Sequence, residues 1–314
     1  MDISVLTALN QGLMWGILAI GVFVSFKVLD FADMTCEGSI ALGGAITAVT
    51  LQAGLHPILA VSFALLGGAG AGLITGLLHT KLRIPPILSG ILTMTALYSI
   101  NLRIMKDRAS ITMLNVKTLT SGLTDALVNG GLAYKYSVQM SNMIIALIFV
   151  ALVIGAIYWF FGTEFGCTIR ATGMNPKMCR AQGINTNTTI IVGLMISNAL
   201  IALAGCLISQ MQFNTTVSMG TGAIVIGLAS IIIGEALTGK KFSFWARLIM
   251  LVVGSILYRL VITMVLMIPG FNTNDLKLLT AIVVAVALAI PAIKGGAKPL
   301  IQKFIGKKGG NENA

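Results

Sequence analysis

Long apolar runs separated by short polar stretches make up most of this chain. A run of about 20 apolar residues is long enough to cross a bilayer as a helix, whereas membrane strands are shorter and alternate in polarity. The pattern predicts an all-α membrane protein, a polytopic bundle of about nine transmembrane helices, within a range of roughly eight to ten. The expected spans are 5–26, 38–53, 57–79, 86–104, 140–162, 188–211, 219–236, 247–268 and 276–293.

The composition excludes a soluble fold. Of the 314 residues 56% are hydrophobic and only 10% are charged, and the mean hydropathy is +0.94. Soluble domains carry about 25% charged residues, so this chain could not cover a water-exposed surface. We expect a single transmembrane domain over residues 1–314. The N-terminus lacks a basic region and a small-residue cleavage site, so we interpret the first apolar run as a retained span.

The net charge of +11 is explained by topology rather than by nucleic-acid binding. Basic residues gather in short loops and in the tail at 294–314, and all of these segments fall on one side, which we expect to be the cytoplasm. An odd number of spans places the N-terminus outside, and one missed helix would reverse it. The long basic connection at 105–139 falls outside and is the exception. The short-loop residues are Lys81, Arg83, Arg170, Lys177, Arg180, Lys240, Lys241 and Arg247.

A polar island at 163–189 separates two apolar runs. Within it Asn175 is a good N-cap, Pro176 suits the first helical position, and Gly183 can adopt the left-handed conformation that ends a helix. The sequence therefore predicts a helix of about two turns at 176–182, with Lys177 and Arg180 exposed. A helix this short is unstable alone, so it is either a docking element for another protein or an ordinary loop with a chance cap.

The island resembles the cytoplasmic coupling loop of ABC importer permeases that serve branched-chain amino acids, simple sugars and related solutes. The resemblance lies in the string from Arg170 to Asn175 and in the string from Ala181 to Asn185. It implies that 163–189 sits in a cleft of an ATP-hydrolysing subunit and transmits its motion to the spans. The residues so implicated are Arg170, Gly173, Asn175, Pro176, Lys177, Met178, Arg180, Ala181 and Gly183, with Glu235 and Lys240 in a neighbouring turn.

A second acidic stretch, DFADMTCEGSIALGGA at 30–45, interrupts the first apolar region. Acidic residues are costly in lipid, so the stretch lies at the surface, in a cavity or within protein. It resembles the segment of the same family that leads into a broken second helix, and such helices line transport paths. It is most similar to a branch associated with amino-acid uptake, aromatic amino acids included, although Glu37 stands where the typical member has Asp.

Several polar residues inside spans are candidates for a translocation path. Arg259 lies about 18 Å beyond Arg247 along a helix, near the middle of the bilayer. It either contacts the solute or is satisfied structurally by backbone carbonyls or by an acid such as Glu235. Thr95 and Ser99 share one helix face. The full set is Asp33, Glu37, Thr95, Ser99, Asn198 and Arg259.

Glycines recur at every fourth position at Gly68, Gly72 and Gly76. Such a small-residue ridge lets a second helix approach closely, so we interpret it as packing. The Gly-rich segment at 219–236 corresponds in character to 38–53, which hints at two related halves.

The sequence contains no recognisable set of catalytic residues. The string from Gly234 to Lys241 nearly spells a phosphate-binding loop, but it lacks the Ser or Thr and the strand–loop–helix context. The two histidines, His56 and His79, have no companion ligands, and the four cysteines have no metal-like spacing. We expect no catalytic residue, metal site or cofactor in this chain.

The resemblance implies a permease subunit in the cell membrane of a prokaryote. Its expected partners are a second permease copy, two ATPase subunits that bind ATP and Mg²⁺, and an extracytoplasmic solute-binding protein. The alternative is a secondary transporter driven by an ion gradient, which would need coupling-ion ligands at mid-membrane, where the sequence places no carboxylate. A membrane-embedded enzyme is the third possibility.

Overall fold

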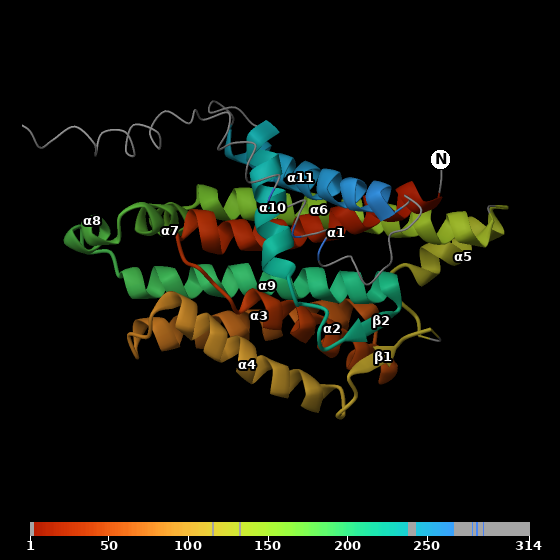
Figure 1. Cartoon of the computed structure of the whole chain (residues 1–314), viewed down its shortest axis with the longest axis horizontal. Helices are drawn as coiled ribbons and strands as arrows, with labels where there is room; N and C mark the ends of the chain where they lie inside the picture. Colours follow the sequence, from red (N-terminus) through yellow and green to blue (C-terminus); the bar gives the residue numbers. More distant parts are fainter. Residues whose placement is uncertain are drawn as a thin grey trace, which may run out of the picture.

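The computed structural model describes residues 3–114, 116–131, 133–237 and 243–266, together with Leu278, Ala281 and Ala285. The span expected at 276–293, the tail at 294–314, Lys240 and Lys241 therefore lie outside the described residues, apart from those three positions. Nearly all described elements are helices that run side by side along one direction (Figure 1).

Among the described residues, six helices are long and apolar enough to cross a membrane. They are α1 (Ile3–Phe23, continued by the π-helical turn η1, Val24–Val28), α3 (Pro57–Thr80), α4 (Pro86–Ile104), α6 (Tyr134–Gly162), α9 (Thr186–Gln212) and α11 (Phe244–Leu266). Two shorter apolar helices, α2 (Cys36–Gln52) and α10 (Ala223–Leu237), lie among them. The expectation of an all-α membrane protein is confirmed.

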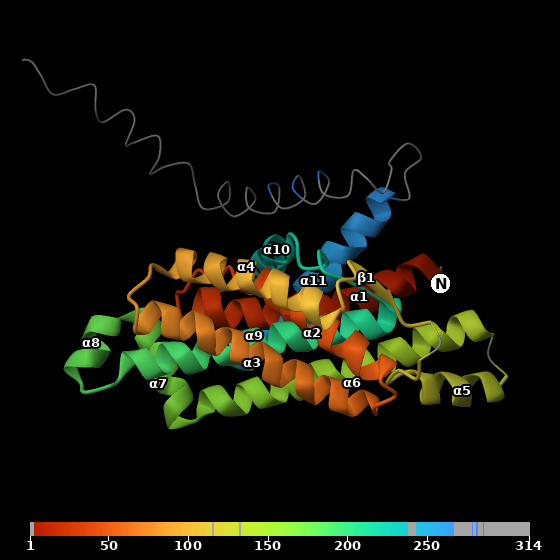
Figure 2. The same ribbon diagram turned by 90° about the horizontal axis from the view of Figure 1, so that it is seen from below.

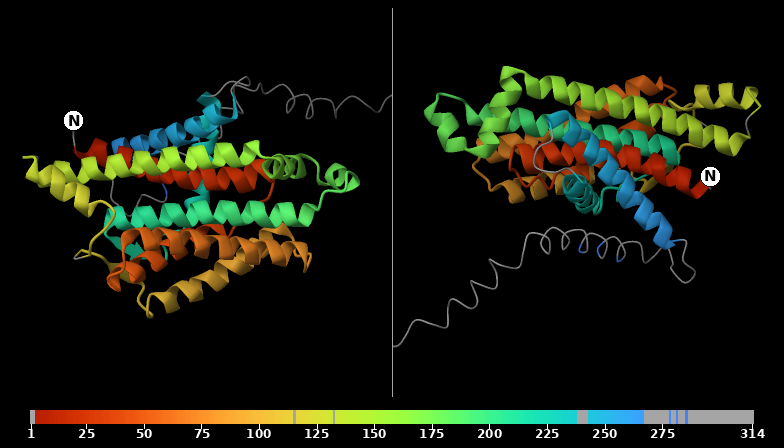
Figure 3. Two further views of the ribbon diagram at one scale, coloured as in Figure 1. Left: turned by 180° about the vertical axis from the view of Figure 1, so that it is seen from behind. Right: turned by 90° about the horizontal axis from the view of Figure 1, so that it is seen from above.

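The smaller elements lie at the two ends of the bundle. Helices α7 (Glu164–Met174) and α8 (Pro176–Ala181) occupy one end. The opposite end carries α5 (Ser121–Asn129), the start of α1, and a two-stranded antiparallel sheet of β1 (Ser110–Thr112) and β2 (Asn214–Thr216) (Figures 1 and 3). Below, these are the α8 end and the sheet end.

Helix boundaries follow the hydrophobic pattern closely where polar residues or proline mark the ends. Helices α3 and α4 start at Pro57 and Pro86, because proline suits the first turn of a helix. Helix α6 begins at Tyr134, well before the apolar run at 140, since its first turns are amphipathic and pack on α5 (Figure 2). The apolar pattern does not reveal such an extension.

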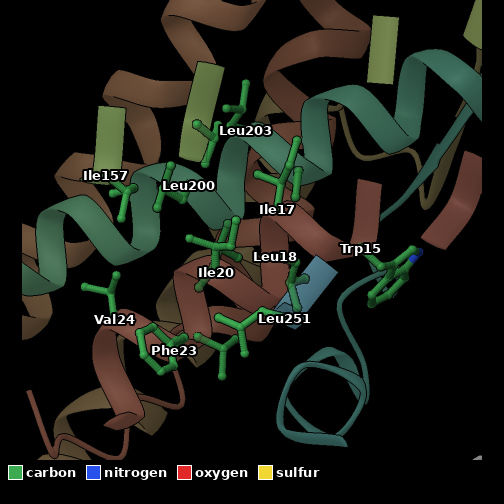
Figure 4. Close-up of a cluster of buried hydrophobic side chains, with 14 of the residues drawn as sticks. Trp15, Ile17, Leu18, Ile20, Phe23, Val24, Ile157, Leu200, Leu203 and Leu251 are labelled. Carbon is green, nitrogen blue, oxygen red and sulfur yellow. The ribbon is translucent and has the colours of Figure 1, made fainter. Parts of the chain in front are cut away.

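Helix α1 is the central helix of the bundle. Its apolar segment is 78% buried, compared with 28% for α4 and α6. Ile17, Leu18 and Ile20 are fully buried and meet side chains from α6, α9 and α11, such as Ile157, Leu200 and Leu251 (Figure 4). A helix that is apolar on all sides is the one expected to be surrounded by others.

The glycine ridge of α3 packs directly on α9, as the spacing predicted. A Cβ at Gly68 would meet the backbone carbonyl of Asn198, and one at Gly72 would meet that of Leu194. Small residues let the two backbones approach closely enough for van der Waals contact to hold the helices together. Close packing of these glycines therefore holds α3 against α9.

The basic short loops share one end of the bundle. Arg83 and Arg180 line one cavity beside α8, and Arg170 contacts Phe244, which lies three residues before Arg247. The start of α1 lies at the sheet end (Figure 3). The described basic segments therefore lie together, as the sequence predicted.

Replacing Gly72 with valine is expected to destabilise the protein by about 1–3 kcal/mol, because backbone atoms of α9 cannot yield to the added side chain. The matched control is Gly70→Val on the same helix, where a Cβ meets nothing within 4 Å. Thermal unfolding in detergent would compare the two variants. Equal losses would attribute the effect to β-branching in the helix and contradict the packing argument.

Candidate functional site

Residues 29–35 form a non-helical break between the end of α1 and the start of α2. Asp33 lies in this break and stabilises it by hydrogen bonds. The connecting residues turn at Asp30, which has a φ of +53°, and Asp33 then lies completely buried. Its Oδ1 accepts a hydrogen bond from the backbone N–H of Thr35 at 2.9 Å, and its Oδ2 accepts one from Asn198 Nδ2 at 2.7 Å. Both carboxylate oxygens are therefore occupied.

Asn198 stands near the midpoint of the 27-residue helix α9, so this contact places Asp33 deep in the bundle. Ser39 donates to Asn198 Oδ1 at 2.6 Å, and the hydroxyls of Thr35 and Thr75 share a hydrogen bond of 2.7 Å. The network joins the break to α2, α3 and α9. Asp33 and Asn198 were both expected on the path, and the structure joins them directly by a hydrogen bond.

A second break lies at the start of α10, and Glu37 connects it to the first. Glu37 is in the first turn of α2, and its Oε1 accepts a hydrogen bond from the backbone N–H of Gly222 at 2.9 Å. Gly222 has a φ of +84°, and a Cβ at Gly220 would meet the carbonyl of Glu37. The N-termini of two short helices therefore meet at one carboxylate.

A cavity of about 340 Å³ lies beside this junction. Glu37 and Thr95, both expected on the path, contribute to its wall, whereas Ser99 is exposed on α4 and does not. The remaining lining side chains come from α2, α4 and the loop before α10. They are Gly38, Ala41, Met94, Tyr98, Asn101, Val217, Ser218 and Thr221.

Arg259 is placed away from this cavity. Its guanidinium lies over the indole ring of Trp15, 4.4 Å from the ring centroid, between α11 and α1. Glu235, considered as its acidic partner, instead forms an ion pair with Lys27 at 3.0 Å. A cation over an aromatic face is favourable inside a membrane, so the geometry supports a structural role for Arg259.

The polar island folds into two helices, of which the sequence predicted only the second. Helix α7 is capped by Thr163, whose hydroxyl accepts a hydrogen bond from the N–H of Gly166 at 3.2 Å. Ile169 and Thr172 of α7 are buried, and Thr172 bonds the hydroxyl of Thr189 in α9 at 3.0 Å. Helix α7 thus packs on the bundle and connects α8 to it.

Helix α8 has the cap and the stop that the sequence predicted. Asn175 Oδ1 accepts a hydrogen bond from the N–H of Met178 at 3.0 Å, and Pro176 is the first helical residue. Gly183 has a φ of +81°, and Ile184 N–H bonds the carbonyl of Cys179 at 3.0 Å, a closed left-handed stop. Both ends of this short helix are therefore satisfied locally.

The coupling candidates divide into an exposed set and an anchoring set. Met178 is 54% exposed, and the neighbouring Met174 is 89% exposed. Asn175, Pro176, Lys177 and Ala181 are also exposed. By contrast, a Cβ at Gly173 would meet the carbonyl of Val28, so Gly173 is where α7 touches the end of α1. Arg170 extends over the ring of Phe244, 5.2 Å from its centroid, and anchors α7 to α11.

A second cavity of about 570 Å³ opens beside α8. Arg180 contributes to its wall, and its Nε donates to the hydroxyl of Thr186 at 2.7 Å. The other lining residues come from the end of α3, the loop after it, the loop between α8 and α9, and the start of α9. They are His79, Thr80, Arg83, Ile184, Asn185, Thr186, Asn187 and Ile190. The cavity therefore presents basic side chains at the α8 end.

The structure adds functional candidates that sequence reasoning missed. Met94, Tyr98 and Asn101 lie on the face of α4 that approaches Glu37, but the pattern of α4 alone marks no inward face. Phe244 is identified only by its contacts with Arg170 and Phe161. The described residues contain no group of three or more His, Cys, Asp or Glu side chains that could hold a metal ion.

Two helices that begin inside a membrane bundle, together with a capped helix projecting from one end, define a polytopic membrane protein of the transport type. The chain belongs to the family described as branched-chain amino acid transport system / permease component, which matches residues 4–290. It is thus a member of the permease family of ABC transporters.

Curated relatives agree with this assignment. The chain is 39% identical to a tyrosine transport system permease protein of Clostridioides difficile over 97% of both chains. It is 25% identical to the ribose import permease protein RbsC of Escherichia coli, over 86% of this chain and 77% of the relative. A solved structure, PsaBC from Streptococcus pneumoniae in complex with Fab, shares the fold with a TM-score of 0.50 at 12% identity, covering 90% of this chain and 89% of that one.

Replacing Asn198 with alanine is expected to lower the free energy of unfolding by about 2–4 kcal/mol, because it leaves Asp33 and Ser39 buried without their partner. Asn187→Ala, an exposed position on the same helix, serves as the control and should change stability by less than about 0.5 kcal/mol. Denaturation in detergent measures both. A stable Asn198→Ala variant would show that the network does not hold the break.

Proposed function

We propose that this chain is the translocating subunit of an ATP-binding-cassette importer and moves an amino acid, in particular an aromatic one, into a prokaryotic cell. The membership of the permease family carries the proposal. The amino-acid class rests on the similarity to the tyrosine transport permease over nearly the whole chain. The chain itself is non-catalytic and binds no cofactor in this proposal, and a partner ATPase binds ATP and Mg²⁺.

Helix α8 is the element that would receive motion from the ATPase. A helix this short is unstable alone, but hydrogen bonds at both of its ends stabilise it here. Met174 and Met178 expose flexible apolar side chains, which adapt well to a partner surface. Arg170 and Gly173 anchor the adjacent helix α7 to α11 and to the end of α1. Displacement of α8 would therefore reach the central helix through direct contacts.

We further propose two ATPase subunits, an extracytoplasmic solute-binding protein at the sheet end and a second copy of this permease. The α8 end would then face the cytoplasm. Helix α4 supports the second copy, since its exposed face carries apolar residues beside the cavity at Glu37. A homodimer would enclose the path between two such faces.

The positions of Asp33 and Glu37 bear on the alternative of an ion-driven secondary transporter. The sequence placed no carboxylate at mid-membrane, whereas Asp33 and Glu37 both lie beside the middle of neighbouring helices. Both oxygens of Asp33 are already occupied by Thr35 and Asn198. A coupling ion would have to displace one of these bonds, so the geometry favours a structural Asp33 over an ion ligand.

Replacing Met178 with aspartate is expected to abolish co-purification of the ATPase, because it places a charge on an apolar contact. The permease would be co-expressed with tagged ABC ATPases of its source organism and purified in detergent. Leu114→Asp makes the same kind of change at the sheet end, where Leu114 is 76% exposed, and should retain the ATPase. Retention by the Met178 variant and by a Gly/Ser replacement of 176–182 would refute coupling through α8.

Solute uptake by the assembled transporter in proteoliposomes is expected to require ATP and the binding protein. Collapse of a proton or sodium gradient should leave the rate unchanged, because the ATPase supplies the free energy. Radiolabelled L-tyrosine uptake measures both conditions. Uptake without ATP that stops when the ion gradient is removed would establish the secondary transporter instead.

A further inference from the structure

The cavity at Glu37 has the chemistry of a binding site. We infer that it holds a zwitterionic amino acid with an aromatic side chain and that Glu37 receives the ammonium group. This inference rests on the proposed transport function and assigns the solute site within it. The volume of about 340 Å³ falls within the range of small-molecule sites, roughly 300–1,000 Å³.

Glu37 has one carboxylate oxygen that can accept a hydrogen bond from a solute. Its Oε1 is held by the N–H of Gly222, whereas Oε2 makes no hydrogen bond or ion pair within the described part of the chain. The described lining includes no Lys, Arg or His. A carboxylate deep in a membrane protein is costly without a positive partner. A protonated amine on the solute supplies that partner.

The two helix N-termini supply the second observation. Helices α2 and α10 both begin at this junction, and each N-terminus carries a partial charge of about +0.5. These positive ends favour a negatively charged group, whereas Glu37 favours a positively charged one. A zwitterion carries both groups, whereas a cationic amine or an anionic acid carries only one. The solute carboxylate would accept from the hydroxyls of Ser218 and Thr221 near the start of α10.

The remaining walls fit an aromatic side chain. Met94 and Tyr98 come from α4, and Ala41 and Val217 face the same space. Thioether and ring contacts both favour an aromatic ligand. Asn101 is the one amide in the lining; its Nδ2 donates to the carbonyl of Gly38 at 3.3 Å, and its buried Oδ1 has no partner among the described residues. This unpaired acceptor belongs to a residue of the cavity wall.

Equilibrium binding of three probes to the full chain in lipid nanodiscs tests the inference. L-Tyrosine carries both charges, tyramine lacks the carboxylate, and 3-(4-hydroxyphenyl)propanoate lacks the ammonium group. We expect L-tyrosine to bind and each of the other two to bind at least about tenfold more weakly, since each leaves one charged part of the site unpaired. Equal affinity for all three probes, or no binding of L-tyrosine, would overturn the inference.

Glu37→Gln is the decisive variant, because glutamine keeps an oxygen for the N–H of Gly222 and removes only the charge. We expect it to lower the affinity for L-tyrosine at least about tenfold. Asp125→Asn, the same change on an exposed residue of α5, should leave affinity unaltered. Unaltered affinity in the Glu37 variant contradicts the assignment.

Tyr98→Leu provides a second readout that does not depend on folding of the Glu37 variant, since Tyr98 is 56% exposed. It should weaken L-tyrosine more than L-leucine, and equal weakening would contradict the aromatic subsite. The test is separable from that of the proposed function. If the ATPase depends on α8 but binding does not depend on Glu37, the importer stands and this site assignment fails.

Discussion

A helix that begins inside a membrane leaves backbone N–H groups that lipid cannot satisfy, and this constraint shapes the structure. The chain meets it with two carboxylates. Asp33 accepts from the N–H of Thr35 just before α2, and Glu37 accepts from the N–H of Gly222 just before α10. Asn198 then fixes Asp33 to the middle of α9. The two acidic residues thus make the broken helices possible.

The same constraint explains why a cavity beside a carboxylate can exist at this depth. Two short helices leave room that two full-length helices would fill, and their N-termini point toward the opening. The long helices around them pack closely through glycines, as α3 does on α9. Rigid, tightly packed neighbours hold the break in place, so the cavity keeps its shape while the outer surface remains apolar.

The α8 end is mechanically continuous with this centre. Helix α7 contacts the end of α1 at Gly173 and α11 through the pair of Arg170 and Phe244. Helix α1 is the most buried of the long helices and touches most of the others. A load applied at α8 therefore has a short path of packed side chains and backbone to the core, as rigid-body transmission requires.

The sequence by itself determined the helical membrane class, the ends of α3 and α4 and the caps of α8, because hydropathy, proline, Asn175 and Gly183 act within a few residues. Tertiary structure decided the rest. The partners of Asp33, Glu37 and Arg259 come from helices distant in the chain, so no local pattern could assign Asn198, Gly222 or Trp15 to them. Helix α7 was missed for the same reason, since its buried face is defined only by contacts with α1, α9 and α11.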